Sequence, residues 1–326
     1  MKRLNFLLVL LAAMNLTLNL EASTEKKVGT SDKKEDSDKT KDSVEKKDDA
    51  KKEEEEEPPK IGNFALPTSQ QPGPLFGFGQ NIIDNKETQI YFFADGFYGR
   101  DKITTDLIPS LLYGISDDLS IYFNFPINPR LRDGLDKSYG KSDFFLQLEY
   151  AFINSKTKTH TNQATLVGNV TFPTGSIKKN PQTGFGSSSI FVGLTYNRTY
   201  VDWMGFTSQG AIVTMFDGRN KIGNQYIYQC GIARNIPSPP DRIYAFMLEL
   251  DGQYYERNII KGKIDHSSGG NIVLITPSLW FSNKRQLLQF GISFPVAQHW
   301  FGEKRKFNWV FNINWALSFY SDDKKK

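Results

Sequence analysis

The sequence predicts an all-β protein: a transmembrane, antiparallel, up-and-down β-barrel of about 12 strands, preceded by a disordered N-terminal tail. Apolar and polar residues alternate along most of the chain from residue 87 onward, which is the period-2 pattern of β-strands. Aromatic residues make up 13% of the chain, yet the mean hydropathy is negative, at -0.45. No apolar run reaches the roughly 18 residues of a membrane-spanning helix. The apolar surface must therefore be spread over one face of many strands.

The first element, residues 1–22, is predicted to be a signal peptide. Lys2 and Arg3 give it a positive start, and the stretch from Phe6 to Met14 is apolar. The small residues Ala22 and Ser23 follow at a plausible cleavage point. This order of charge, apolar core and small residues is typical of an export signal. The mature protein is therefore expected in the bacterial cell envelope.

The next element, residues 23–60, is predicted to be a disordered, charged tail on the periplasmic side. Lys, Glu, Asp, Ser and Thr dominate it, and it ends with the run Glu53–Glu57 followed by two prolines. Such a composition cannot bury a hydrophobic core. The tail is either a solvated spacer or a contact for a periplasmic partner.

Residues 61–86 differ from the tail because they are apolar and rich in proline and glycine. Pro72–Pro74 (PGP) and Phe76–Gly79 (FGFG) lie in this stretch, before the first predicted strand. An apolar stretch at this place is either a linker or a plug that enters the lumen of the barrel.

Residues 87–320 are predicted to form the barrel. In the last segment Trp309, Phe311, Trp315 and Phe319 share one face, and the polar Asn312 lies on the other. An apolar outer face with a polar inner face suits a barrel in a lipid bilayer. The predicted strands are 87–99, 104–113, 119–129, 142–153, 163–174, 187–199, 203–216, 224–235, 243–255, 271–281, 286–296 and 307–319.

The predicted connections alternate between short turns and longer loops. This alternation is typical of outer-membrane barrels whose termini lie in the periplasm and whose long loops face outward. The long loops are rich in Lys and Arg, which predicts contact with the anionic lipids of the outer leaflet. The chain ends with the aromatic pair Phe319-Tyr320, of the kind read by the barrel-assembly machinery, and then a polar extension, residues 321–326.

Several junctions resemble those of a known family, the outer-membrane transporters named after the meta-pathway of phenol degradation. The similar motifs are Tyr113–Leu119 (YGISDDL), Phe125-Pro126, Phe172–Gly175 (FPTG), Thr183–Ser187 (TGFGS), Ser268–Gly270 (SGG), Thr276–Leu279 (TPSL) and Phe294–Val296 (FPV). They extend over roughly residues 61–320. The resemblance implies a barrel that moves small organic molecules, aromatic or hydrophobic ones among them.

Polar residues at alternate positions of two predicted strands form the candidate lumen-lining site. They are Gln147, Glu149, Glu249, Asp251 and Gln253. Their alternation with apolar residues places them on the inner face, where they would line or plug the interior. Alternatively, these residues have no role in permeation and are simply charged and polar groups that face a water-filled interior.

No catalytic, cofactor or metal site is predicted. His160 and His299 stand alone, and the net charge of +4 is too small to indicate a nucleic-acid partner. His266–Ser268 (HSS) is the one stretch that resembles a hydrolase motif, since His can activate Ser. We therefore predict a passive outer-membrane channel for small solutes. The alternatives are a surface or structural barrel whose loops bind lipid phosphate and, with less support, a membrane lipid hydrolase.

Overall fold

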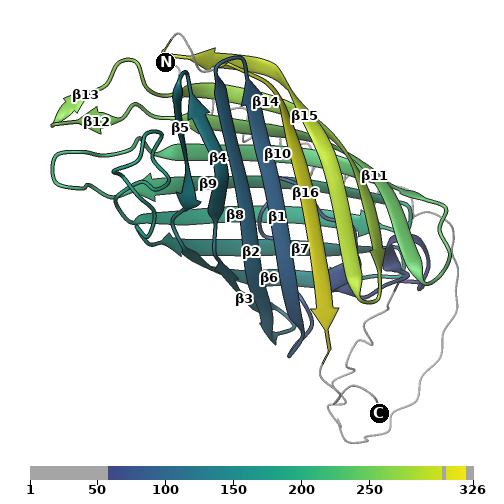
Figure 1. Cartoon of the computed structure of the whole chain (residues 1–326). Helices are drawn as coiled ribbons and strands as arrows, with labels where there is room; N and C mark the ends of the chain where they lie inside the picture. Colours follow the sequence, from purple (N-terminus) through teal and green to yellow (C-terminus); the bar gives the residue numbers. More distant parts are fainter. Residues whose placement is uncertain (1–57, 303–305, 321–326) are drawn as a thin grey trace, which may run out of the picture. The chain divides into compact units, whose positions relative to one another are not determined.

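The computed structural model describes residues 58–302 and 306–320, and its main element is a closed antiparallel β-barrel (Figure 1). Each wall strand pairs with its neighbours in chain order, and β1 pairs with both β2 and β16, which closes the ring. The twelve predicted strands are therefore confirmed. The wall strands are β1 (Thr88–Gly99), β2 (Lys102–Ser116), β3 (Leu119–Asn124), β6 (Phe145–Lys156), β7 (His160–Thr171), β8 (Ser189–Tyr200), β9 (Trp203–Thr214), β10 (Gln225–Ile236), β11 (Arg242–Tyr255), β14 (Gly270–Asn283), β15 (Gln286–Trp300) and β16 (Phe307–Phe319).

The two faces of the wall differ as the alternation predicts. On β16, Phe311 and Trp315 are 39% and 38% exposed, whereas Asn312 and Asn314 are 0% and 4% exposed. Exposed apolar side chains would be unfavourable in water, but they suit contact with lipid acyl chains. The outer surface of the barrel is therefore a hydrophobic one, and its polar residues point inward.

One predicted strand, 119–129, is interrupted in the structure. β3 ends at Asn124, and after Phe125-Pro126 the chain continues as β4 (Ile127–Asp133), which pairs with the far half of β2. Pro126 has no N–H to donate to the ladder, so the break falls there. β4 and β5 (Asp136–Lys141) form a hairpin that lengthens the wall on one side (Figure 1).

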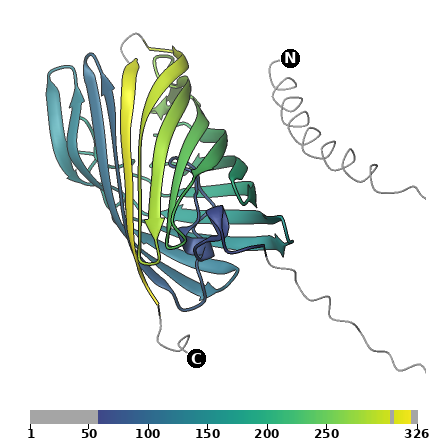
Figure 2. The same ribbon diagram turned by 90° about the vertical axis from the view of Figure 1, so that its right-hand side faces the viewer.

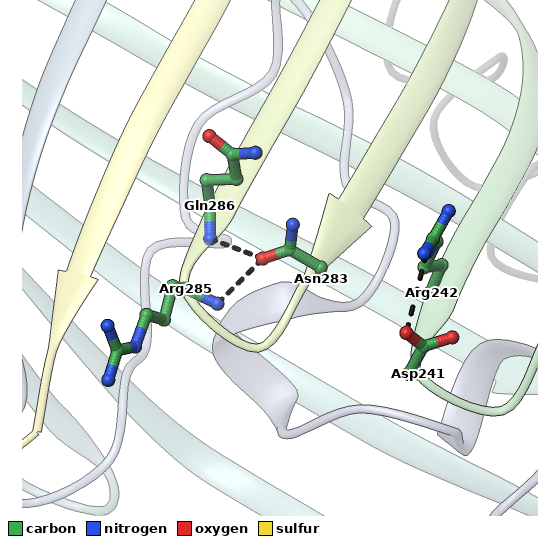
Figure 3. A network of polar contacts seen from close by, with 5 residues as sticks. All are labelled: Asp241, Arg242, Asn283, Arg285 and Gln286. Carbon is green, nitrogen blue, oxygen red and sulfur yellow. Dashed lines mark hydrogen bonds and ion pairs between the residues drawn. The ribbon is translucent and has the colours of Figure 1, made fainter.

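The short connections lie at the end of the barrel where β1 begins and β16 ends, which we call the short-turn end. The turn between β14 and β15 is an example (Figure 3). The side-chain oxygen of Asn283 accepts hydrogen bonds from the backbone N–H groups of Arg285 (2.9 Å) and Gln286 (3.1 Å). Asn closes a tight turn in this way because its side chain substitutes for a backbone acceptor. Asp241 and Arg242 form an exposed ion pair (3.4 Å) where β11 begins.

The connections at the opposite end are long, except for the two-residue link between β1 and β2. One of them contains the small hairpin β12 (Ile259–Ile260) and β13 (Lys263–Ile264), which was not predicted (Figure 1). Within the described residues, no helix has the length and apolar character needed to cross a membrane. The predicted signal peptide, the tail up to residue 57 and the extension 321–326 lie outside the described residues.

The outward direction of the apolar residues can be tested at Leu194, near the middle of β8. This side chain is 49% exposed and faces away from the lumen. We expect Leu194→Arg to lower the free energy of unfolding by about 2–4 kcal/mol, because a charge there would enter the hydrocarbon layer. Denaturant unfolding in phospholipid vesicles measures this change, with Leu194→Phe as the control that keeps the position apolar. An Arg variant as stable as the Phe variant would contradict a lipid-facing position.

Candidate functional site

The interior of the barrel contains residues 61–86, which we call the lumen segment. It includes two short 3-10 turns, η1 (Gly62–Phe64) and η2 (Thr68–Gln70), and is otherwise irregular. Figure 2 shows its first part between the strands of the wall, near the short-turn end. At that end the backbone N–H of Asn63 donates to the carbonyl of Val201, in the turn between β8 and β9 (2.8 Å).

The segment rises from the short-turn end, passes the middle of the barrel and returns. Phe76 is its farthest point, where its ring lies 6.4 Å from that of Phe97, near the other end of β1. The chain then descends to Glu87, whose carbonyl accepts from the N–H of Gly114 (3.0 Å). Both ends of the segment therefore lie at the short-turn end.

Apolar contacts attach the segment to the wall. Leu66 joins a buried cluster with Trp280 and Leu287, and Ile83 packs with Leu112 and Tyr122. Burying a Leu or Ile side chain stabilises a structure by about 1.5–3 kcal/mol. These contacts explain why the segment is apolar although it forms no strand.

Two buried carboxylates of the wall accept hydrogen bonds from the backbone of the segment. Glu249 of β11 accepts from the N–H groups of Leu75 (2.8 Å) and Phe76 (3.3 Å). Glu149 of β6 accepts from the N–H of Asn81 (2.9 Å) and from its side-chain amide (2.7 Å). An irregular chain leaves its N–H groups without strand partners, and the carboxyl oxygens of the wall supply acceptors for them.

Polar side chains of other strands donate to the carbonyl groups of the segment. These bonds are Gln289 to Gly73 (3.1 Å), Gln229 to Phe76 (3.0 Å), Thr195 to Phe78 (2.6 Å) and Ser282 to Gln70 (2.6 Å). The N–H of Ile83 donates to the hydroxyl of Ser120 (3.2 Å). The inner wall thus satisfies the middle of the segment through side chains. At its two ends the segment forms backbone hydrogen bonds, from the N–H of Asn63 to Val201 and from the N–H of Lys86 to Gly114 of β2.

Glycines of the wall give the segment room. A Cβ atom at Gly193 would lie 2.4 Å from the ring of Phe78, and one at Gly291 would lie 2.6 Å from Leu75. Gly210 lies opposite Gly193 in the register of β8 and β9 and widens the same recess. Any larger residue at these places would displace the side chains of the segment, so the wall and the segment are complementary in shape.

The five residues predicted to line the lumen divide into two groups. Gln147 donates to Glu149 (2.7 Å) on β6, and the two lie on the wall across the barrel from the second group. Asp251 accepts from Gln229 (3.2 Å) and Thr276 (2.8 Å) beside Glu249 on β11. Gln253 accepts from the hydroxyl of Tyr255 on the same strand.

A cavity of about 260 Å³ lies beside the lumen segment. Aromatic residues such as Tyr91 and Trp280 and amides such as Asn124 and Asn314 form its wall. Of the five predicted residues, Gln147 is the one that lines this cavity. The sequence did not single out the other amides of the lining, although Asn124, Asn197 and Asn314 lie at inward positions of their strands.

The stretch resembling a hydrolase motif has a structural task in the loop between β11 and β14. The hydroxyl of Ser268 is buried, donates to the carbonyl of Asp265 (2.8 Å) and accepts from the N–H of Asn258 (2.8 Å). Nδ1 of His266 lies 3.2 Å from the guanidinium of Arg257. Both hydroxyl contacts of Ser268 are therefore to the backbone. In the part of the chain that the structure describes, no three His, Cys, Asp or Glu side chains gather as a metal site.

The closed wall, its apolar outer surface and its polar interior define an outer-membrane β-barrel. Among solved structures it is similar to an outer-membrane channel from Pseudomonas putida F1, with a TM-score of 0.61 and 15% sequence identity over 76% of this chain and 99% of that chain. At this identity the likeness concerns the fold alone. No family model matches the chain, and no curated protein sequence matches it.

A more distant likeness exists to the β domain of the Bordetella autotransporter BrkA, with a TM-score of 0.41 and 10% identity over 72% of this chain and 98% of that chain. A TM-score this low does not support a shared arrangement. The comparisons thus support the fold of an outer-membrane β-barrel, and they contain no sequence match to the family that the motifs resemble.

The attachment of the lumen segment can be tested at Glu249. We expect Glu249→Gln to loosen the segment. The Gln side chain would turn an N–H₂ group toward the backbone N–H groups of Leu75 and Phe76, from which Glu249 accepts hydrogen bonds. The measurement uses a background in which Cys230→Ala removes the one native thiol. In this background Gln80→Cys places a reporter thiol in the lumen segment, and the rate of its reaction with a membrane-impermeant maleimide measures how exposed the segment is. The rate should rise roughly tenfold, which corresponds to about 1.4 kcal/mol.

Glu256→Gln is the matched control for this test, since Glu256 accepts from Asn224 (2.9 Å) and Tyr226 (3.1 Å) in the loops. Equal labelling rates in the two variants would show that Glu249 does not restrain the segment.

Proposed function

We propose that this protein is a passive outer-membrane channel for small organic solutes, and that the lumen segment narrows its passage. The observation on which the proposal depends is the cavity beside the segment, inside a closed wall. A barrel of twelve strands is intermediate between narrow barrels filled by side chains and wide porins. An inserted segment therefore leaves a narrow passage in a lumen of this size.

The way the segment is attached supports a role in limiting passage. The middle of the segment contacts the wall through side chains such as Glu149, Glu249 and Thr195, and through no strand pairing. It can thus change its position while the ladder of the wall remains intact. The aromatic residues of the cavity and the sequence resemblance both favour organic solutes over inorganic ions.

The same proposal includes an orientation and partners. The short-turn end faces the periplasm, and the tail before residue 58 lies on that side, where it meets a periplasmic partner. The long loops, with basic residues such as Arg130, Lys137 and Lys263, face the anionic lipids of the outer leaflet. The barrel-assembly machinery inserts the chain.

The second candidate is a surface or structural barrel that passes no solute. The basic loops and the extensive contacts of the lumen segment are the observations in its favour, because a fully occupied lumen would conduct nothing. No observation favours the lipid hydrolase, since the Ser268 hydroxyl is engaged by the loop backbone.

Single-channel recording in planar bilayers tests the channel and separates the two candidates. We expect small, steady conductance steps from the full chain. A variant in which four Gly-Ser residues replace residues 63–84 should conduct several-fold more, because the lumen segment would no longer fill the barrel. A heat-modifiable band on gels serves as the control for folding. A folded variant with no more conductance than the full chain would contradict the proposal.

A further inference from the structure

The lining of the cavity differs in charge from the rest of the interior. Glu249 and Asp251 lie elsewhere on the inner wall, where the lumen segment and neighbouring side chains engage them. Glu149 is likewise engaged by Asn81 and Gln147. Among the described residues, the cavity is lined by aromatic, aliphatic, hydroxyl and amide side chains, and by no Asp, Glu, Lys, Arg or His.

Several polar atoms of this lining have no partner in the described part of the chain. They are the side-chain oxygens of Asn197 and Asn314 and the side-chain nitrogen of Gln80, and all three atoms are buried. Buried polar groups without a partner are rare and unfavourable in folded proteins. Such atoms around an open space indicate a place for a molecule that both donates and accepts hydrogen bonds.

These atoms are distributed around the cavity. Asn197 belongs to β8 and Asn314 to β16, which lie on opposite sides of the ring of strands, and Gln80 belongs to the lumen segment. A molecule with a single polar group would reach one of them at a time. A molecule with hydroxyl groups around its whole rim can pair with successive partners wherever it lies.

Apolar surface lies next to the amides. Phe93 is directly opposite Asn314 in the register of β1 and β16, and Trp280 and Tyr91 also face the cavity. An aromatic face beside amides suits a ring that has one apolar face and a hydroxylated rim. The cavity, at about 260 Å³, is smaller than the roughly 300–1,000 Å³ of drug-sized sites, which fits a molecule of one ring.

We propose that this cavity is a binding site for a small, uncharged, polyhydroxylated ring molecule of the monosaccharide or cyclitol class. The assignment rests on the proposed function in one respect: the channel supplies the route by which such a molecule arrives. A charged solute would lose its hydration without gaining a counter-charge. A hydrocarbon would leave the amides of the lining unpaired.

Isothermal calorimetry on the purified full chain in detergent tests the site with four probes. They are myo-inositol and glucose as neutral polyols, glucuronate as the charged match for glucose, and phenol as a ring with one hydroxyl. We expect both polyols to bind at least roughly tenfold more tightly than glucuronate and phenol. Tighter binding of phenol or glucuronate than of both polyols, or no binding of either polyol, would overturn the assignment.

Two variants of β16 make the test specific. Asn314 and Asn312 face inward two residues apart, and each has an unpartnered side-chain oxygen, but only Asn314 lines the cavity. We expect Asn314→Leu to weaken polyol binding roughly tenfold and Asn312→Leu to leave it unchanged. Equal effects of the two variants would refute a site at the cavity.

Liposome swelling separates this assignment from the proposed function. Polyol binding without swelling in any solute, even after removal of the lumen segment, would support the site and refute the channel. Swelling at equal rates in glucose and glucuronate, without polyol binding, would support the channel and refute the site. Faster swelling in glucose, lost in Asn314→Leu, supports both.

Discussion

The structure depends on one constraint: every backbone N–H and C=O inside a lipid bilayer needs a partner, because the hydrocarbon layer contains no water to supply one. The wall meets this constraint by closing, since β1 pairs with both β2 and β16 and so has hydrogen bonds along both of its edges. The lumen segment cannot meet it in the same way. Its proline and glycine content prevents a regular strand, so its backbone depends on side chains of the wall.

This dependence explains the chemistry of the inner face. Glu149 and Glu249 accept from backbone N–H groups, and Gln229, Gln289 and Thr195 donate to carbonyl groups. Donors and acceptors of the wall are thus matched to acceptors and donors of the segment. In a lumen filled only with water, Glu149 and Glu249 would be exposed to that water, whereas here both are fully buried. The acidic residues of this barrel are better understood as the attachment of its segment than as the lining of an ion path.

The sequence predicted the wall well and the interior less well, for physical reasons. The alternation along β16 is visible because lipid and lumen impose opposite polarity on neighbouring residues. The sequence predicts β3 and β4 as one strand, 119–129, because the two sides of Pro126 have the same alternation. The inward direction of Glu249 follows from the same period of two. Its partner Leu75 lies 174 residues away in the chain, and no local pattern encodes such a contact.

The two cavity amides Asn197 and Asn314 could not be recognised as site residues from the sequence. Asn197 and Asn314 alternate with apolar residues as Glu249 does, yet nothing in the sequence distinguishes an amide that faces an open cavity from one that binds the segment. That difference arises from the path of the lumen segment, which in turn follows from the recess at Gly193 and Gly210 that admits Phe78. Because no Asp, Glu, Lys, Arg or His of the described residues lines the cavity, the space beside the segment is uncharged. In the proposed channel, the selectivity is therefore set by the path of an apolar segment through a polar lumen.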